Sequence, residues 1–342
     1  MRDRESGRMH KEVGVRAIAH RLIGIGFEKT ALALTGVGVF ALYLLVLAGG
    51  DGPARQADAA GADGTRSAAT LKTADVLFVG GAGKLAATFR DFGYDLDAVR
   101  AGAEAVPRLL VASFPGDLAQ LPSATDRKRV FIQALLPLVL TANERILAER
   151  SRVKALRAVL AADRPLGARN EAWLARMYDR YGTDDIDELL RRVDIVPPSL
   201  AIAQAAEESG WGTSRFAREG NALFGQRTYR PQRAGIVPQA RAEGERFTVR
   251  AYGQLLDAVR AYKGNLNTHA AYDEFRRRRA ALRAAGRPVD GSRLAAALSR
   301  YSARGADYVA SIRRIIRVNR LDQLDRARLS GDPSGHRILP ET

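Results

Sequence analysis

The alternation of apolar and polar residues divides the chain into an apolar N-terminal stretch, a polar stretch and a long region of mainly helical periodicity. Residues 30–50 form an uncharged run of 21 residues rich in Leu, Val, Ala and Gly. As a helix, this run is long enough to cross a hydrocarbon core of roughly 30 Å. Residues 51–67 are rich in Gly, Ala and Asp and cannot bury enough surface to fold alone. The pattern therefore predicts one transmembrane helix followed by a flexible linker.

Apolar positions at helical spacing continue through most of the remaining chain. Residues 130–160 predict a long helix with a kink at Pro137. Residues 173–181 predict a helix whose Trp173, Met177 and Tyr181 form a core stripe. Further helices are expected at residues 255–266, 294–299 and 308–318.

Strict alternation is confined to residues 247–252, where apolar residues occupy every second position between Gly244 and Gly253. This predicts a strand of a β-hairpin whose other arm lies near residues 223–229, and no convincing strand elsewhere. By periodicity alone, the fold class is mostly α with a small β element.

The charge distribution sets the expected topology. Residues 1–29 contain seven Lys or Arg residues against four Asp or Glu residues, so the positive-inside rule puts the N-terminus in the cytoplasm and everything after Asp51 outside. A cleaved signal peptide is the alternative, but the apolar run is long and Leu45, Leu47 and Gly49 provide no small-x-small cleavage site. We therefore expect an uncleaved inner-membrane anchor with the remaining chain in the periplasm.

The net charge of +16 allows attraction to polyanions. Arginines are spread along the chain, and the one dense run is at residues 276–279. No interleaved aromatic platform or known nucleic-acid fold accompanies it. We expect a solvated helix face, or a patch facing anionic envelope polymers or lipid headgroups, and no nucleic-acid partner.

Composition also limits the chemistry. The chain contains no cysteine, which excludes disulfides, thiolate nucleophiles and Cys-based zinc sites. The four histidines lack metal-ligand spacing, and His269 suits a turn or capping role. The sequence thus predicts neither an obligatory metal nor a cofactor.

Residues 200–208 predict an Ala-rich helix that starts at Pro197-Pro198-Ser199 and stops at Gly210. The acidic pair Glu207 and Glu208 lies at its end. Partial burial there would raise a carboxyl pKa and keep an acid protonated near neutral pH. A solvated acidic pair on a surface helix is the alternative interpretation.

Several motifs together resemble a known family. Glu208-Ser209-Gly210-Trp211-Gly212 followed by Asn221-Ala222-Leu223-Phe224-Gly225 is similar to the signature of the peptidoglycan glucosaminidases of glycoside hydrolase family 73. Segments 127–144, 235–272 and 301–309 resemble the Bax-like branch of that family, so the resemblance covers roughly residues 75–325. It implies a lysozyme-like α+β fold, peptidoglycan as the substrate, and Glu208 as the general acid, with Glu207 structural or solvent-facing.

A second catalytic group is less clearly indicated. Glycosidases pair the acid with a second carboxylate, or use the 2-acetamido group of the substrate as nucleophile. Glu245 is the preferred second carboxylate, with Glu243 the alternative in the adjacent loop. Tyr301 resembles the family's cleft tyrosine and would orient the acetamido group.

Sugar-binding candidates are Asn221, Phe224, Tyr229 and Tyr252, of which the aromatic ones could stack on sugar faces or pack in the core. Asn221 would shape the loop after the catalytic helix through side-chain to backbone hydrogen bonds. Ser209 lacks a His-Asp set and is not expected to be a nucleophile.

These observations predict a membrane-tethered endo-β-N-acetylglucosaminidase acting on peptidoglycan. The alternatives are a catalytically weak scaffold protein, a muramidase or lytic transglycosylase, and a basic module for nucleic acid or lipid. A regulatory protein partner is plausible but not identified. The expected organisation is a cytoplasmic basic segment, transmembrane anchor, flexible linker, helical accessory region or control element, lysozyme-like glucosaminidase domain and C-terminal tail, at residues 1–29, 30–50, 51–72, 73–192, 193–325 and 326–342.

Overall fold

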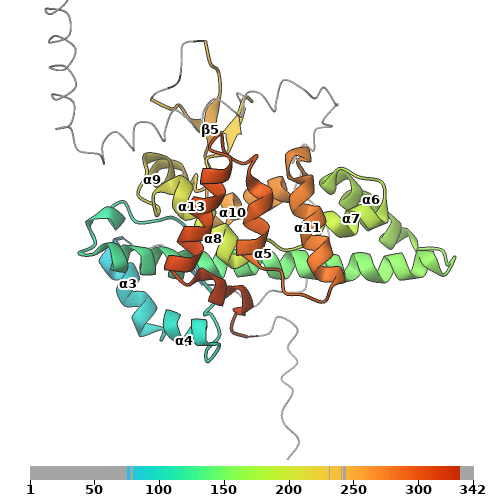
Figure 1. Ribbon diagram of the computed structural model, residues 1–342, viewed down its shortest axis with the longest axis horizontal. Coiled ribbons are helices and arrows are strands. Elements are labelled where there is room, and N and C mark those ends of the chain that lie inside the picture. Colours follow the sequence, from blue (N-terminus) through green and yellow to red (C-terminus); the bar gives the residue numbers. More distant parts are fainter. Residues whose placement is uncertain (1–74, 78–79, 231, 240, 242–243, 332–342) are drawn as a thin grey trace, which may run out of the picture.

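A long helix, α5 (Ala124–Ala161), runs lengthwise through the protein in Figure 1. The computed structural model describes residues 75–77, 80–230, 232–239, 241 and 244–331. Ser123 caps the start of α5 by accepting a hydrogen bond from the Asp126 N–H at 3.0 Å. The helix continues through Pro137 as one element of 38 residues.

The first half of α5 lies in the main hydrophobic core, as Val130 to Val139 are all buried. Its second half packs on α6 (Ala168–Tyr181) and α7 (Ile186–Arg192) around a smaller cluster. Met177 and Tyr181 are buried in that cluster and Trp173 packs against it, so the predicted core stripe is confirmed.

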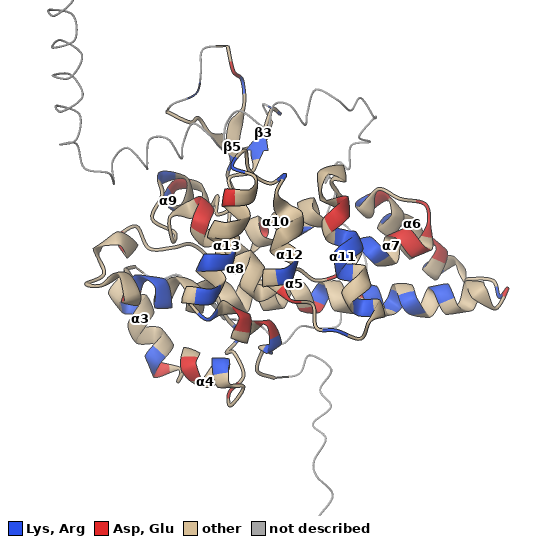
Figure 2. Cartoon of the chain, in the orientation of Figure 1, with Lys and Arg blue, Asp and Glu red and all other residues tan. Residues whose placement is uncertain are grey.

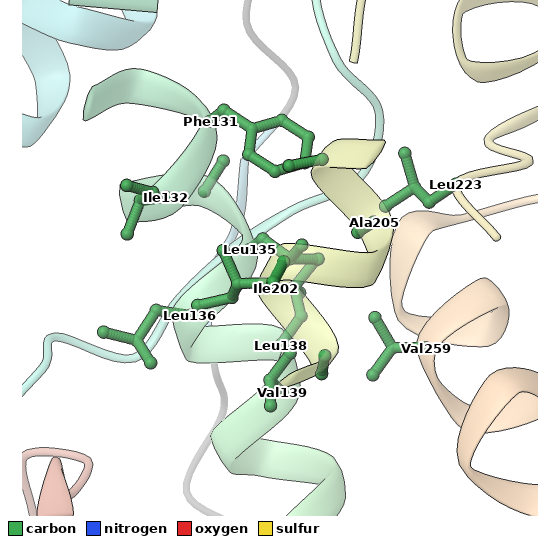
Figure 3. Packing of buried hydrophobic residues seen from close by; sticks show 14 of the residues in the cluster. Phe131, Ile132, Leu135, Leu136, Leu138, Val139, Ile202, Ala205, Leu223 and Val259 are labelled. Atoms are coloured by element: carbon green, nitrogen blue, oxygen red, sulfur yellow. The ribbon is translucent and has the colours of Figure 1, made fainter. Parts of the chain in front are cut away.

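Helix α8 (Pro198–Ser209) lies across α5 in the middle of the core (Figure 1). Pro198 occupies its first turn, and Gly210 ends it in the left-handed conformation, as the sequence predicted. Figure 3 shows Leu135 and Leu138 of α5 meeting Ile202 and Ala205 of α8. Small Ala side chains allow this close approach of the two helices.

The remaining helices surround α8. Residues on both sides of position 192 contribute to one hydrophobic cluster, which includes Leu85, Phe131, Leu200 and Tyr308. The surrounding α-helices are α3 (Ala82–Asp91), α4 (Leu96–Ala101), α9 (Arg215–Gly220), α10 (Leu255–Thr268), α11 (Asp273–Ala284), α12 (Gly291–Ala295) and α13 (Ala306–Val318). The 3₁₀ helices are η1 (Leu118–Gln120), η2 (Ala270–Tyr272), η3 (Ala296–Leu298) and η4 (Leu321–Arg326).

A small antiparallel sheet projects from the helices at the top of Figure 1. Its central strand β5 (Thr248–Arg250) pairs with β3 (Arg227–Thr228) and β4 (Gly235–Ile236). The mostly helical fold and the predicted arm near residues 223–229 are confirmed. The predicted hairpin is a three-stranded sheet, because the two-residue strand β4 is too short to show an alternating pattern.

A second sheet contradicts the expectation that strands occur only near residues 224–252. β1 (Asp75–Leu77) pairs in parallel with β2 (Leu109–Val111), with Asp75 opposite Leu109. Residues 109–111 are all buried, so they carry no alternation. Periodicity cannot separate such a short apolar run from a helix segment.

The apolar character of α5 serves the core. Within the described residues, α5 is the one helix long and apolar enough to cross a membrane, with a mean hydropathy of 1.4 in its most apolar window. However, 78% of that window is buried inside the protein. The predicted anchor at residues 30–50 lies outside the described residues.

The arginine run on α11 is not the solvated face that its charge predicted. Arg277 and Arg278 are exposed, but Arg276 and Arg279 are 2% and 0% exposed. Figure 2 shows α11 beside α7, and Arg279 donates hydrogen bonds to the carbonyls of residues 191, 192, 194 and 195. Helical spacing places residues 276 and 279 on one inward face, where backbone acceptors replace water.

Candidate active site

Glu208 lies in the last turn of α8, the helix that passes through the middle of the core. The residues before it from Pro198 to Ala206 are buried, and Glu208 is half-buried. The side chain therefore emerges from the core at the point where the helix ends.

The turn after Glu208 is fixed by its own residues. The Ser209 hydroxyl donates to the Ala205 carbonyl at 2.5 Å and accepts from the Gly212 N–H at 2.9 Å. Trp211 has φ of 59° and its ring meets the Phe131 ring edge-on at 5.5 Å. Ser209 is thus a buried turn residue, which agrees with the expectation that it is not a nucleophile.

Gly212 is sterically required at this turn. Its φ is +79°, and a Cβ would lie 3.1–3.2 Å from side-chain atoms of Leu118, Phe114 and Phe131. A side chain at this position would therefore displace the turn that carries Glu208.

A buried polar network lies behind Glu208. Gln204, one turn earlier on α8, accepts a hydrogen bond from the Tyr262 hydroxyl at 2.7 Å and donates to the Tyr308 hydroxyl at 2.9 Å. The Tyr308 hydroxyl is also hydrogen-bonded to the Glu208 carboxyl. Since Gln204 donates to Tyr308, the hydroxyl proton of Tyr308 is directed to Glu208.

This environment raises the pKa of Glu208 to about 7. Burial is the largest cause, because it disfavours the charged carboxylate, and the negative charge of Glu207 adds to it. The hydrogen bond from Tyr308 and the charge of Arg304 act in the opposite direction. A substantial fraction of Glu208 is therefore protonated at neutral pH and can donate a proton.

Glu207 has a different environment. Its carboxylate accepts from Arg304 Nη1 at 2.7 Å and from the Ser311 hydroxyl at 3.0 Å. Glu207 thus joins α8 to α13 and the residues before it.

Glu208 lines a small pocket of about 40 Å³. Among the described residues that line it, Glu208 is the one carboxylate. Gly225, where a Cβ would lie 3.7 Å from Glu208 Oε2, brings the chain after α9 close to the acid. The lining residues are Glu208, Phe224, Gly225, Gln226, Arg227, Asn265, Tyr272 and Tyr301.

Two other sequence-predicted residues belong to this pocket. Tyr301 stacks on Tyr308 with ring centroids 5.5 Å apart, and its hydroxyl donates to the Phe224 carbonyl at 3.4 Å. Burial, followed by the nearby ionisable groups of Tyr308 and Glu208, raises the pKa of Tyr301 well above its ordinary value. Phe224 is buried and stacks on Tyr262 at 3.9 Å.

Glu245 and Tyr229 are not among the lining residues of this pocket. Glu245 lies between β4 and β5, and its Oε2 is buried with no hydrogen-bond partner among the described residues. Tyr229 is 49% exposed, and its ring centroid is 6.1 Å from that of Phe247. Their catalytic and binding roles stay predictions.

Asn221 and Tyr252 do not line the pocket. Asn221 ends α9 with φ of 51°, and its amide donates to the carbonyls of Tyr252 and Gly253 at 3.1 and 3.4 Å. The Tyr252 hydroxyl donates to Gln226, which lines the pocket. Both side chains therefore connect the loop after α9 to the start of α10.

Sequence reasoning missed several residues around Glu208. Gln204 precedes Glu208 by one helical turn, so its spacing places it on the same face and could have identified it. Tyr272 and Tyr308 lie in segments that resemble the family, but only the fold brings them together. The other missed lining residues are Gln226, Arg227 and Asn265.

No group of three or more His, Cys, Asp or Glu side chains within the described part of the chain could hold a metal ion. His269 instead accepts a hydrogen bond from the Ala271 N–H at 3.2 Å, as expected for a turn residue. The absence of an obligatory metal stays a prediction.

Comparison with known proteins places the site within a matched region. The glucosaminidase family model, described as mannosyl-glycoprotein endo-beta-N-acetylglucosaminidase, matches residues 183–321. Protein bax of Escherichia coli (strain K12) is 36% identical over 203 residues, which cover 56% of this chain and 69% of bax. No solved structure matches the chain. All residues that line the Glu208 pocket lie within residues 183–321.

Proposed function

The chain belongs to the glucosaminidase family, which is glycoside hydrolase family 73. On this premise we propose that it is an endo-β-N-acetylglucosaminidase that hydrolyses β-1,4 bonds of peptidoglycan. The family implies a peptidoglycan-type glycan as the substrate class. Our proposal adds the bond that is cleaved and Glu208 as the general acid.

The half-buried carboxyl of Glu208 in its pocket is the observation that carries this proposal. Cleavage of a glycosidic bond requires a proton for the leaving oxygen. A carboxyl with a pKa of about 7 is protonated often enough at neutral pH to supply it. Tyr308 holds the Glu208 carboxyl by a hydrogen bond, and Gln204 holds Tyr308. The carboxyl would therefore deliver its proton to a fixed position in the pocket.

For the nucleophile that attacks the anomeric carbon, the pocket favours the 2-acetamido group of the substrate over a second carboxylate. Among the described residues that line the pocket, Glu208 is the one carboxylate, and Tyr272, Tyr301 and Asn265 offer hydroxyl and amide groups. These groups would orient the 2-acetamido group, whose oxygen attacks the anomeric carbon while Glu208 protonates the leaving oxygen. Water would then open the resulting ring, with Glu208 accepting the proton. Glu245 as a second carboxylate is the alternative route.

We also propose that the protein is tethered to the inner membrane by residues 30–50, with its catalytic part in the periplasm. The support is the uncharged run of 21 residues and the excess of basic residues before it. Peptidoglycan lies on that side of the membrane, so the topology and the substrate class agree.

The test is digestion of purified peptidoglycan by the full-length protein, beside Glu208→Gln and the matched control Glu207→Gln. Mass spectrometry of the reducing ends identifies the bond that is cut. We expect fragments ending in N-acetylglucosamine from the parent and from Glu207→Gln, and at least a 100-fold loss in Glu208→Gln, as expected for a general acid.

Other products would change the assignment. Ends in N-acetylmuramic acid would indicate a muramidase, and 1,6-anhydro ends would indicate a lytic transglycosylase. Binding of folded protein to peptidoglycan with no released fragment would contradict hydrolysis and favour a scaffold protein.

A further inference from the structure

Three arginines gather on the projecting sheet beside the active site. Arg250 lies on β5 opposite Gly235, and Arg230 and Arg233 lie in the turn between β3 and β4. The Arg233 N–H donates to the Arg230 carbonyl at 3.1 Å, which keeps the turn short. We call Arg230, Arg233 and Arg250 the sheet arginines; Figure 2 shows basic residues on β3 and β5 at this end of the molecule.

The charges of the sheet arginines are not neutralised within the described part of the chain. No carboxylate there forms an ion pair with any of them, whereas Arg277 and Arg278 on α11 pair with Glu274. Burial first, then the positive charges of Arg250 and Arg230, lower the pKa of Arg233. Mutual repulsion of this kind would be relieved by a bound anion.

Arg250 is connected to the Glu208 pocket through Tyr252 and Gln226. The Arg250 guanidinium lies 4.7 Å from the centre of the Tyr252 ring. Tyr252 donates to Gln226, and Gln226 lines the pocket with Glu208. The Arg250 N–H also donates to the Gln226 carbonyl at 2.7 Å. A glycan held at Glu208 therefore has the charge of Arg250 two side chains away, and Arg230 and Arg233 are close enough to Arg250 for their charges to interact.

Peptidoglycan presents anions beside its scissile bonds. Every N-acetylmuramic acid carries a lactyl group, which ends either in a free carboxylate or in a peptide stem with carboxylates of its own. Chitin has the same β-1,4-linked backbone and N-acetyl groups but no carboxylate. Carboxylates on alternate sugars thus distinguish the two polymers chemically.

We infer that the sheet arginines form a carboxylate-binding subsite that recognises the acidic substituents of N-acetylmuramic acid and so selects peptidoglycan over uncharged glycans. The inference builds on the proposed function and adds the determinant of substrate selection. Charge-assisted hydrogen bonds from guanidinium groups to carboxylates provide the recognition.

The test measures binding by the full-length protein carrying Glu208→Gln, so that no ligand is cut. It is compared with two triple variants. The first combines Glu208→Gln with Arg230→Glu and Arg233→Glu, and the second combines Glu208→Gln with Arg314→Glu and Arg317→Glu. The second set changes two exposed arginines of α13 and gives the same net charge. A further variant, with Arg230→Lys and Arg233→Lys, keeps the charge of the sheet.

The ligands are N-acetylglucosamine oligomers, glycan strands stripped of their peptides, and strands with intact stems. We expect charge reversal on the sheet to weaken binding of carboxylate-bearing strands about tenfold, as for the loss of one or two exposed charge-assisted contacts. The α13 control and the lysine variant should change it much less, and the oligomers should not distinguish the variants. Rising salt should reduce the preference.

The two kinds of acidic strand identify the source of the carboxylate. A loss confined to strands with stems supports recognition of the stem, and an equal loss on stripped strands supports recognition of the lactyl carboxylate. Equal losses in the sheet and α13 variants, or no loss on either acidic strand, would overturn the inference. Failure of the parent to cut peptidoglycan would instead contradict the proposed hydrolysis, because the binding assay does not depend on cleavage.

Discussion

At the residue scale, Glu207 and Glu208 show how neighbouring carboxyls acquire different properties. Glu207 is paired with Arg304 and Ser311, whereas Glu208 faces a pocket and accepts from Tyr308. Adjacent positions on a helix differ in direction by about 100°, so each meets a different set of neighbours. An acid with a raised pKa results at one position and a structural ion pair at the other.

The first prediction concerns pH. As general acid, Glu208 must be protonated, so kcat/KM should fall as pH rises through about 7. The folded pKa of about 7 exceeds the ordinary value of 4.5, so ionisation opposes folding. This penalty is absent below about pH 4.5 and complete above about pH 7.

Stability measurements check the sign independently of activity. Urea unfolding gives the free energy of unfolding of Glu208→Gln minus that of the parent. This difference should be more favourable to the variant at pH 8 than at pH 4, by at most about 3 kcal/mol. Glu207→Gln loses an ion pair and should show no such gain. An equal effect of Glu208→Gln at both pH values would refute the buried-acid assignment.

The second prediction concerns Tyr308. Its hydrogen bond lowers the pKa of Glu208, so Tyr308→Phe should raise that pKa and move the alkaline loss of activity to higher pH. The variant also leaves buried Gln204 without an acceptor, which should cost about 1–3 kcal/mol. The pH profile of hydrolysis and urea unfolding measure the two effects.

A matched control exists in the core. The Tyr94 hydroxyl is buried and has no hydrogen-bond partner among the described residues. Tyr94→Phe should therefore leave the pH profile unchanged and not reduce stability. A profile that moves to lower pH in Tyr308→Phe would contradict the direction of the hydrogen bond.

At the element scale, α8 and the turn after it act as a support for Glu208. The helix is held by its Ala-rich face on α5, and the turn is held by Ser209 and by the ring of Trp211. The position of Glu208 therefore depends on packing at residues that do not line the pocket.

The third prediction tests this support. Gly212→Ala should destabilise the protein by about 2–4 kcal/mol, because it combines a left-handed backbone with close contacts to three core side chains. Gly102→Ala also has a left-handed backbone, with φ of +74°, but its added Cβ meets nothing within 4 Å. It should cost only about 1 kcal/mol. Equal losses in thermal unfolding would show that the contacts at Gly212 relax freely.

The fourth prediction concerns the buried arginine of α11. Arg279 is completely buried and donates to the carbonyls of residues 191, 192, 194 and 195 and to Asn267 Oδ1. Burial alone would raise the pKa of Asp194, but hydrogen bonding to Arg283 and the charges of Arg279 and Arg150 hold it below its ordinary value. Asp194 is thus ionised and needs these cations.

Arg279→Ala should therefore cost about 3–5 kcal/mol, since it leaves several buried carbonyls without a donor and removes one of the three cations around the buried Asp194 carboxylate. Arg278→Ala removes an exposed arginine of the same helix and should change stability little. Urea unfolding of the two variants measures the difference. Similar small losses would show that water replaces Arg279.

At the scale of the whole molecule, the site depends on segments from most of the described chain. Apolar residues of α3, α5, α8, α10 and α13 share one cluster, so the part before residue 193 supports α8 directly. The helical region at residues 73–192, whose role the sequence left open, contributes α5 to this support. The domain boundary at residue 192 and a regulatory role for this region stay predictions.

The fifth prediction concerns membrane topology. The chain has no cysteine, so a maleimide labels only a cysteine that is introduced and reports on which side of the membrane that residue lies. Ser67→Cys should react with a membrane-impermeant maleimide added to spheroplasts, and Ser6→Cys should react only after the membrane is permeabilised. Labelling of both in intact spheroplasts, or of neither, would contradict an inward N-terminus with the rest of the chain outside.

The sequence alone determined the features that depend on neighbouring residues. The ends of α8, the core stripe of α6 and the location of β3 and β5 follow from Pro, Gly and apolar periodicity, because these act over one or two turns of chain. The motif at residues 208–225 also singled out Glu208, Asn221 and Phe224 as candidates, and the separate segment that begins at Tyr301 singled out that tyrosine.

Only the tertiary structure decided which distant residues meet. The pairing of β1 with β2, the burial of Arg276 and Arg279, and the gathering of Tyr262, Tyr272 and Tyr308 around Glu208 join segments far apart in the sequence. Without knowledge of its partners, a charged residue is predicted to be exposed. The partners of Arg276 and Arg279 include backbone carbonyls, which only the fold brings to them. For the same reason the raised pKa of Glu208 came from the fold, since burial depends on what covers the end of α8.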